Sequence, residues 1–166
     1  MIQKSWPAVL IPLSFLLTVP AAFCQEKALK FSRKEYYSVM ATGDTKKIEH
    51  QIGIVRQSVV PEKNAYEGTL LMKKAGLAKG ASRKLTLFKQ GHQQLEAAIA
   101  KDSNNAELRF LRLMIQEHSP GLLRYKNELD KDSAYIRQSF KKLPVDVQQA
   151  ITDYSKTSKV LRSEDF

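Results

Sequence analysis

The chain has 166 residues, and its 27 lysines and arginines exceed its 17 aspartates and glutamates, giving a formal net charge of +10. Its single cysteine excludes a disulfide within the chain. No serine stands in a nucleophile-elbow motif, and no glycine-rich loop follows a strand pattern. The sequence therefore lacks the signatures of hydrolases and of phosphate-binding loops.

The N-terminal residues have the three-part pattern of a secretory signal peptide. Lys4 supplies the positive start, residues 8–23 are mainly apolar, and no acidic residue occurs before Glu26. A retained membrane anchor is the alternative. A spanning helix needs about 20 apolar residues, whereas this run is shorter and contains Pro12 and Pro20. We therefore expect a cleaved signal.

The cleavage site follows from the small residues that signal peptidase requires one and three positions before the cut. Ala22 and Cys24 meet this requirement, so we predict a signal peptide over residues 1–24, with cleavage after Ala21 as the alternative. Lipoproteins are cleaved directly before a cysteine that follows a small residue, and the bulky Phe23 disfavours lipid anchoring at Cys24. We expect an exported protein, periplasmic or secreted.

The remaining residues suffice for a single helical domain over 25–161, followed by a flexible tail over 162–166. Removal of the signal takes away the only cysteine and the only tryptophan, so thiol catalysis and thiolate metal sites are not expected. A basic exported domain meets anionic lipid, acidic glycans or acidic proteins more readily than nucleic acid, which we do not expect as a partner.

Apolar residues recur at helical spacing along the mature chain, and no alternating run is long enough for a strand. The sequence predicts an all-α fold of about seven antiparallel helices, without a transmembrane segment in the mature chain. Val59 and Leu85 are expected on the core faces of the second and fourth helices, and Ser82 as the cap of the fourth. The expected ranges are 32–43, 44–60, 62–77, 82–101, 105–118, 122–143 and 144–154, the sixth with a kink or restart at 130–133.

The expected helix at 105–118 is apolar around most of its circumference, which predicts a position in the middle of the fold. Arg109 and Arg112 lie on its narrow polar strip and need partners there. Internal ion pairs are one interpretation, and the carboxylates expected to make them are those of Glu107, Glu128 and Asp130. The other interpretation is a groove for a carboxylate or phosphate, which arginine forks bind well.

The segment LEAAIAKDSNNAEL at 95–108 resembles the second helix of a tetratricopeptide repeat and the entry to the next repeat. The family's small, aromatic and second small positions of that helix fall on Gly91, Leu95 and Ala98, and Gly68 and Leu71 match the preceding helix. Ser103 stands where the family usually has proline. The resemblance covers about 63–118 and implies a tetratricopeptide-like middle; an ordinary helical hairpin is the alternative.

The mature chain is also similar to a group of short exported proteins of Bacteroidota-type bacteria. The stretch NAELRFLRLMIQEHSP, a following basic aromatic helix and a late Leu-Pro turn carry this similarity. The resemblance implies export and a helical fold, but no reaction.

Two pairs, each of a histidine and a glutamate, are the remaining candidates for catalysis or metal binding. His92 and Glu96 are four residues apart, but a zinc site usually needs three or four ligands and the other histidines are distant in sequence. Glu117 and His118 fit a histidine at a negative helix end better than an acid–base pair. We expect no enzyme activity, no metal and no cofactor.

Binding is the remaining function, and two classes stay open. The first is an interaction module that holds an envelope protein or peptide in a helical groove. The second is a binder of anionic envelope lipid or glycan through basic helical hairpins. The candidate binding residues are Arg109, Arg112, Lys84 and Arg124, within basic clusters that also include Lys73, Lys74, Lys79, Arg83, Lys89 and Lys126.

Overall fold

Three helices begin at side-chain caps that the sequence predicts. The side-chain oxygens of Ser32, Asp44 and Asn105 accept hydrogen bonds from first-turn backbone N–H groups. The helices that they cap are α1 (Arg33–Ala41), α2 (Thr45–Gln57) and α5 (Ala106–His118). These caps satisfy backbone donors that a helix start otherwise leaves without a partner.

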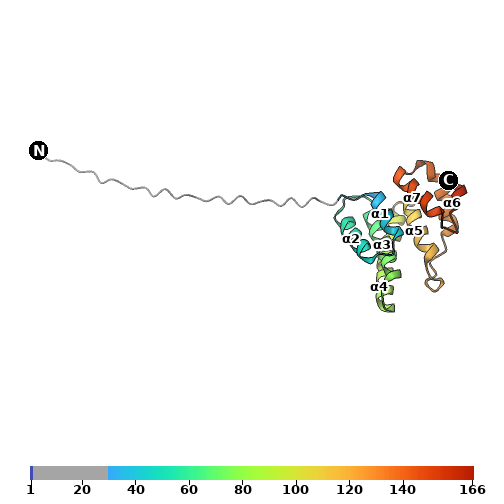
Figure 1. Ribbon diagram of the computed structural model, residues 1–166, viewed down its shortest axis with the longest axis horizontal. Coiled ribbons are helices and arrows are strands. Elements are labelled where there is room, and N and C mark those ends of the chain that lie inside the picture. Colours follow the sequence, from blue (N-terminus) through green and yellow to red (C-terminus); the bar gives the residue numbers. More distant parts are fainter. Residues whose placement is uncertain (2–29) are drawn as a thin grey trace.

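The computed structural model describes Met1 and residues 30–166, so the predicted signal peptide and the predicted cleavage residues Ala22 and Cys24 lie outside the described residues. Residues 30–166 form seven α-helices and no strand, which confirms the all-α prediction (Figure 1). The other helices are α3 (Lys63–Leu77), α4 (Ala81–Lys101), α6 (Leu129–Ser139) and α7 (Val145–Ser155), with short 3-10 turns η1 (Gly121–Leu123), η2 (Phe140–Lys142) and η3 (Ser163–Asp165).

Helix α5 lies in the middle of the fold, as its all-round apolar character predicts. Phe110, Leu111 and Leu113 are fully buried on it, and all seven helices contribute to one hydrophobic core. Helices α3, α4 and α6 pack against α5, while α1 packs against both α2 and α7. The polar strip of α5 is therefore enclosed together with its apolar residues.

Two glycines let α3 and α4 cross at very short range. A Cβ atom on Gly68 would lie 2.5 Å from the carbonyl oxygen of Gly91, and one on Gly91 would collide with the carbonyl oxygen of Gly68. The two backbones are thus in direct contact, and no side chain separates them. The assignment of this hairpin to tetratricopeptide architecture stays a prediction.

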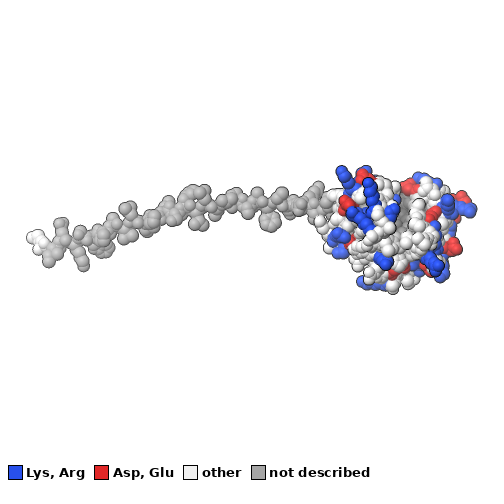
Figure 2. Space-filling view, turned by 90° about the horizontal axis from the view of Figure 1, so that it is seen from below, with Lys and Arg blue, Asp and Glu red and all other residues white. Residues whose placement is uncertain are grey.

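Beyond this crossing, the hairpin projects from the rest of the fold. The ten helical steps from Ala81 to Gly91 extend about 15 Å. Figure 1 shows this end of α4 and the loop at 120–127 pointing to the same side of the molecule. Seen from that side, the surface carries more lysine and arginine than acidic side chains (Figure 2).

The projection corrects two expectations about α4. Leu85 is 45% exposed, and residues 81–86 around it at the start of α4 are all exposed. Ser82 is not the cap: α4 begins at Ala81 after Gly80, whose φ of 83° favours glycine.

Val59 is also wrongly expected in the core, since it is 99% exposed. Helix α2 ends at Gln57, where the backbone N–H and hydroxyl of Ser58 both donate to the carbonyl oxygen of Val55. Residue 59 therefore follows the helix, and the helical spacing that placed Val59 inward no longer applies to it.

The largest error concerns residues 122–128, which were expected to be helical. Only the short turn η1 forms there, and Arg124 stops it with a left-handed φ of 49°. Tyr125 is buried against α4 and donates a hydrogen bond to Glu96. This tertiary contact accompanies a non-helical backbone at 124–126 and overrides the local helical preference.

The C-terminal residues 162–166, expected as a flexible tail, contact α6 and η2. Arg137 pairs with Asp165 at 2.8 Å, and the rings of Phe140 and Phe166 lie 4.6 Å apart between centroids. The preceding Leu161 is fully buried.

The glycine crossing generates a stability prediction. Gly68→Ala and Gly91→Ala should each lower the free energy of unfolding by about 1–3 kcal/mol, because each added methyl group meets a backbone carbonyl that cannot rotate away. Urea unfolding measures the change. Gly53→Ala in α2 is the matched control: its Cβ meets nothing, so it should be neutral or stabilising by about 0.5–1 kcal/mol. Wild-type stability of both crossing variants would contradict the close contact.

Candidate anion-binding face

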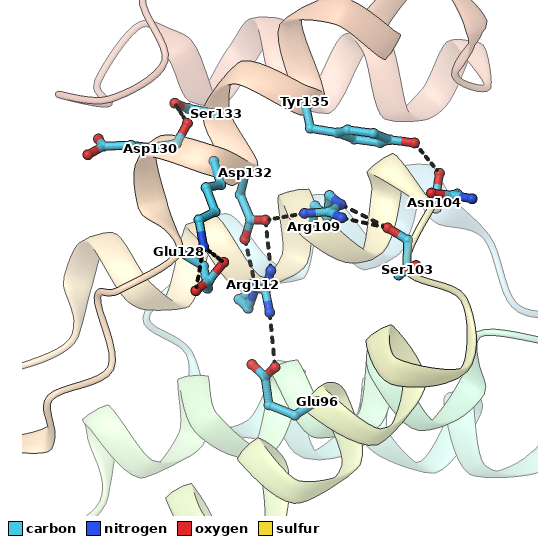
Figure 3. A network of polar contacts seen from close by, with 11 residues as sticks. Glu96, Ser103, Asn104, Arg109, Arg112, Glu128, Asp130, Asp132, Ser133 and Tyr135 are labelled. Carbon is cyan, nitrogen blue, oxygen red and sulfur yellow. Dashed lines mark hydrogen bonds and ion pairs between the residues drawn. The ribbon is translucent and has the colours of Figure 1, made fainter.

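The two candidate arginines of α5 converge on one buried carboxylate (Figure 3). Arg112 donates to both oxygens of Asp132, at 2.7 and 2.8 Å, and Arg109 donates to the same carboxylate at 3.0 Å. Asp132 lies in the first turn of α6 and is fully buried. Arg109 also donates twice to the carbonyl oxygen of Ser103, and its guanidinium group lies over the ring of Tyr135.

Arg112 extends this network to α4. Its third nitrogen donates to Glu96 at 3.0 Å, and the other oxygen of Glu96 accepts the hydroxyl of Tyr125. Burial alone would lower the pKa of Arg112, but the hydrogen bonds and charge of Asp132, with Glu96, raise it above its ordinary value. Burial, with the hydrogen bond to Glu96, also raises the pKa of Tyr125. The guanidinium group thus stays charged and the phenol stays neutral.

The structure therefore places Arg109 and Arg112 in internal ion pairs, one of the two interpretations of the sequence. The carboxylates differ from those expected: Glu107 pairs with Arg33 of α1, and Glu128 pairs with Lys131. Every nitrogen of both guanidinium groups donates a hydrogen bond within the fold. Asp132, Glu96 and Ser103 therefore already occupy the positions that a bound carboxylate or phosphate would take on these nitrogens.

The two candidate histidines, His92 and His118, make packing and hydrogen-bond contacts within the fold. The ring of His92 packs against Tyr125 and Phe88, and Nδ1 of His118 lies 3.0 Å from the carbonyl oxygen of Met114. In the part of the chain that the structure describes, no three His, Cys, Asp or Glu side chains converge as metal ligands. Glu117 accepts hydrogen bonds from Tyr154, Ser158 and Lys159, which tie the end of α5 to the C-terminal segment.

The remaining candidates, Lys84 and Arg124, are exposed on the α3–α4 hairpin and on the neighbouring 120–127 loop, and we call the cationic residues of these two segments the basic face. Its members are Lys73, Lys74, Lys79, Arg83, Lys84 and Lys89 on the α3–α4 hairpin, with Arg124 and Lys126 on the 120–127 loop. No acidic residue occurs between Glu67 and Glu96 in the sequence. Among the described residues, the ion pair of Lys74 with Glu49 is the only one that a member makes.

Two aromatic contacts hold the hairpin and the loop side by side. Tyr125 lies 5.7 Å from Phe88 and 4.6 Å from His92 between ring centroids. Phe88 and His92 are four residues apart on α4, and Lys84 precedes Phe88 by another four, so all three share one helical face. This face of α4 runs along the loop that carries Arg124.

A shallow pocket of about 230 Å³ opens on the basic face where the hairpin tip meets the start of α2. Lys74, Lys79 and Arg83 line it with Thr45, Leu77 and Ala78, and no carboxylate lines it. Burial lowers the pKa of the neighbouring Lys73, while the bond from Lys74 lowers the pKa of Glu49. Sequence spacing gave no sign of Thr45, because it lies about 30 residues away in the chain.

Comparison with protein-family models, with curated proteins and with solved structures finds no match to this chain. Within residues 30–166, no helix has both the length and the apolar composition needed to span a bilayer.

The buried network generates a second prediction. Arg112→Ala should lower the free energy of unfolding by about 3–5 kcal/mol, because it leaves the fully buried Asp132 with only Arg109 as its charged partner. The double variant Arg112→Met with Asp132→Leu should lose less, since it removes both charges. Urea unfolding measures both variants.

Lys156→Ala is the control for this prediction, because the pair of Lys156 with Asp153 is exposed and should contribute less than about 1 kcal/mol. An Arg112→Ala protein as stable as the wild type would show that this guanidinium group is free for a ligand.

Proposed function

We propose that this protein is an exported, non-enzymatic binding module that attaches to anionic material of the cell envelope through its basic face. The observation that carries the proposal is the concentration of eight lysines and arginines on two segments, the α3–α4 hairpin and the 120–127 loop, which point to the same side of the molecule. Seen from that side, the surface carries more lysine and arginine than acidic side chains (Figure 2). Such a surface produces a positive potential that attracts anions and speeds their encounter with the protein.

The different environments of the basic residues support this assignment. Arg109 and Arg112 donate to groups inside the fold, so their charges are compensated there. Lys84 and Arg124 are exposed and make no ion pair with any described residue. Uncompensated charge on a surface repels itself and is relieved when an anionic partner binds.

The arrangement favours an anionic ligand over a peptide held in a groove along α4–α6. That groove would need Arg109 and Arg112 as its anchors, and each guanidinium group already makes three hydrogen bonds and an ion pair with Asp132 within the fold. The pocket at Lys79 and Arg83, in contrast, is lined by cations and is open to a phosphate, sulfate or carboxylate group.

Export can be tested separately through the mass of the protein recovered from the envelope of its own cell. Cleavage after Cys24 predicts a chain that begins at Gln25 and carries no lipid. A mass that retains residues 1–24, or one that shows lipid on Cys24, would contradict this part of the proposal.

Binding can be tested with charge-reversal variants. The pair Lys84→Glu and Arg124→Glu should weaken binding to phosphatidylglycerol vesicles or to dextran sulfate by at least about tenfold, because each cation near an anionic surface contributes roughly 1 kcal/mol. Wild-type binding should also weaken between roughly 0.01 M and 0.15 M salt, as the Debye length falls from about 30 to about 8 Å. Co-sedimentation or fluorescence titration measures both.

The matched control is the pair Lys141→Glu and Lys142→Glu on η2, which changes the net charge equally but lies outside the basic face. It should retain most of the binding. Equal losses in both pairs would show that only net charge matters. Binding that is indifferent to salt and to all four substitutions would contradict the proposal and favour an apolar groove.

A further inference from the structure

Exposed leucines stand at the ends of both projections of the basic face. Leu77 and Leu85 flank the turn between α3 and α4 and are 40% and 45% exposed. Leu122 lies in η1 on the neighbouring loop and is 94% exposed. Large hydrophobic side chains are costly to leave in water, so three of them on one projecting side need an explanation.

Each of these leucines is close to cations of the basic face. Leu77 lines the pocket with Lys79 and Arg83, Leu85 directly follows Lys84, and Leu122 is two residues from Arg124. The contact of Phe88 with Tyr125 keeps the two leucine-bearing tips beside each other. Apolar side chains surrounded by lysine and arginine have the composition of segments that lie in a bilayer interface.

The shape of this surface separates a bilayer from the other anionic partners. A soluble polyanion would contact the cations but would leave the leucines in water. A folded protein partner would be expected to meet a continuous packed patch, whereas these leucines lie on two separate segments, the α3–α4 turn and η1. A fluid bilayer needs no matching shape, and it offers anionic headgroups above an apolar layer.

We infer that the hairpin tip and the 120–127 loop dock on an anionic lipid bilayer, with Leu77, Leu85 and Leu122 entering its interface. The inference rests on the proposed function and adds the lipid as ligand and the apolar contact as part of its binding. Interfacial elements insert about 5–10 Å, and the hairpin projects about 15 Å beyond its crossing. The tips can therefore enter without immersing the core.

The docking is tested with the protein as the cell produces it, on vesicles of phosphatidylglycerol and phosphatidylcholine. Every variant carries the same N-terminus, so any lipid affinity of residues 1–29 is common to all of them. Leu85→Ser with Leu122→Ser should weaken partitioning by at least about tenfold, and most clearly at high salt, where the charges are screened. Leu122→Ser alone should lose about threefold or more without any effect on folding, because this side chain contacts little of the protein.

Tryptophan probes give a readout that does not depend on affinity. The emission of Leu122→Trp, after subtraction of the wild-type signal, should shift to the blue when anionic vesicles are added. Val59→Trp is the control: Val59 is 99% exposed and follows the end of α2, about 20 Å from Thr45 at the pocket. Its emission should not change, and Val59→Ser should bind as the wild type does.

The outcomes separate this inference from the proposed function. Leucine variants that bind as well as the wild type, with no shift at residue 122, would overturn the insertion while the charge-reversal losses leave anionic binding standing. Wild-type binding to dextran sulfate without binding to the vesicles would overturn the lipid in favour of a glycan. Failure of the charge-reversal variants to lose binding would overturn both proposals together.

Discussion

Two arginines on the most deeply enclosed helix oblige the fold to supply carboxylates inside the protein. Breaking a buried ion pair costs far more than breaking an exposed one, so Arg112 and Asp132 must be positioned together whenever α5 and α6 pack. The second contact of Arg112, to Glu96, brings α4 into the same network, and Glu96 in turn holds Tyr125. The orientation of the 120–127 loop therefore depends on a charge that lies two contacts away from it.

The cationic residues divide into two groups by what surrounds them. The arginines of α1 and α5 compensate carboxylates between helices, and their removal would be felt as lost stability. Most of the basic face adds little to folding, because its members other than Lys73 and Lys74 are exposed and make no ion pair with any described residue. The positive charge is therefore not spread evenly, since a run of cations without nearby acidic residues in the sequence lies on the α3–α4 hairpin.

Helices that have a capping residue or a clear apolar periodicity are predicted from the sequence. Caps such as Asp44 and Asn105, and the periodic stripe of α5, act over a few residues and are visible without tertiary information. The loop at 120–127 has no proline or glycine after Gly121 that would predict the end of a helix. Only the hydrogen bond of Tyr125 to the distant Glu96 explains why its backbone is not helical. The position of Arg109 and Arg112 on a mainly apolar helix predicts that they need internal partners. Their pairing with Asp132 depends on where α6 begins, and α6 begins directly after the 120–127 loop, whose conformation the sequence does not predict.

The close crossing of α3 and α4 depends on two glycines, which have no side chain. The residues that hold the hairpin together are therefore different from those exposed at its tip. Gly68 and Gly91 hold the helices together through backbone contact, about ten residues away from the turn at 78–80. Residues 76–86, around the turn, are exposed apart from the half-buried Ala78. The end of the hairpin can consequently accept new side chains at little cost to folding, which leaves its ligand preference free to diverge while the scaffold stays the same.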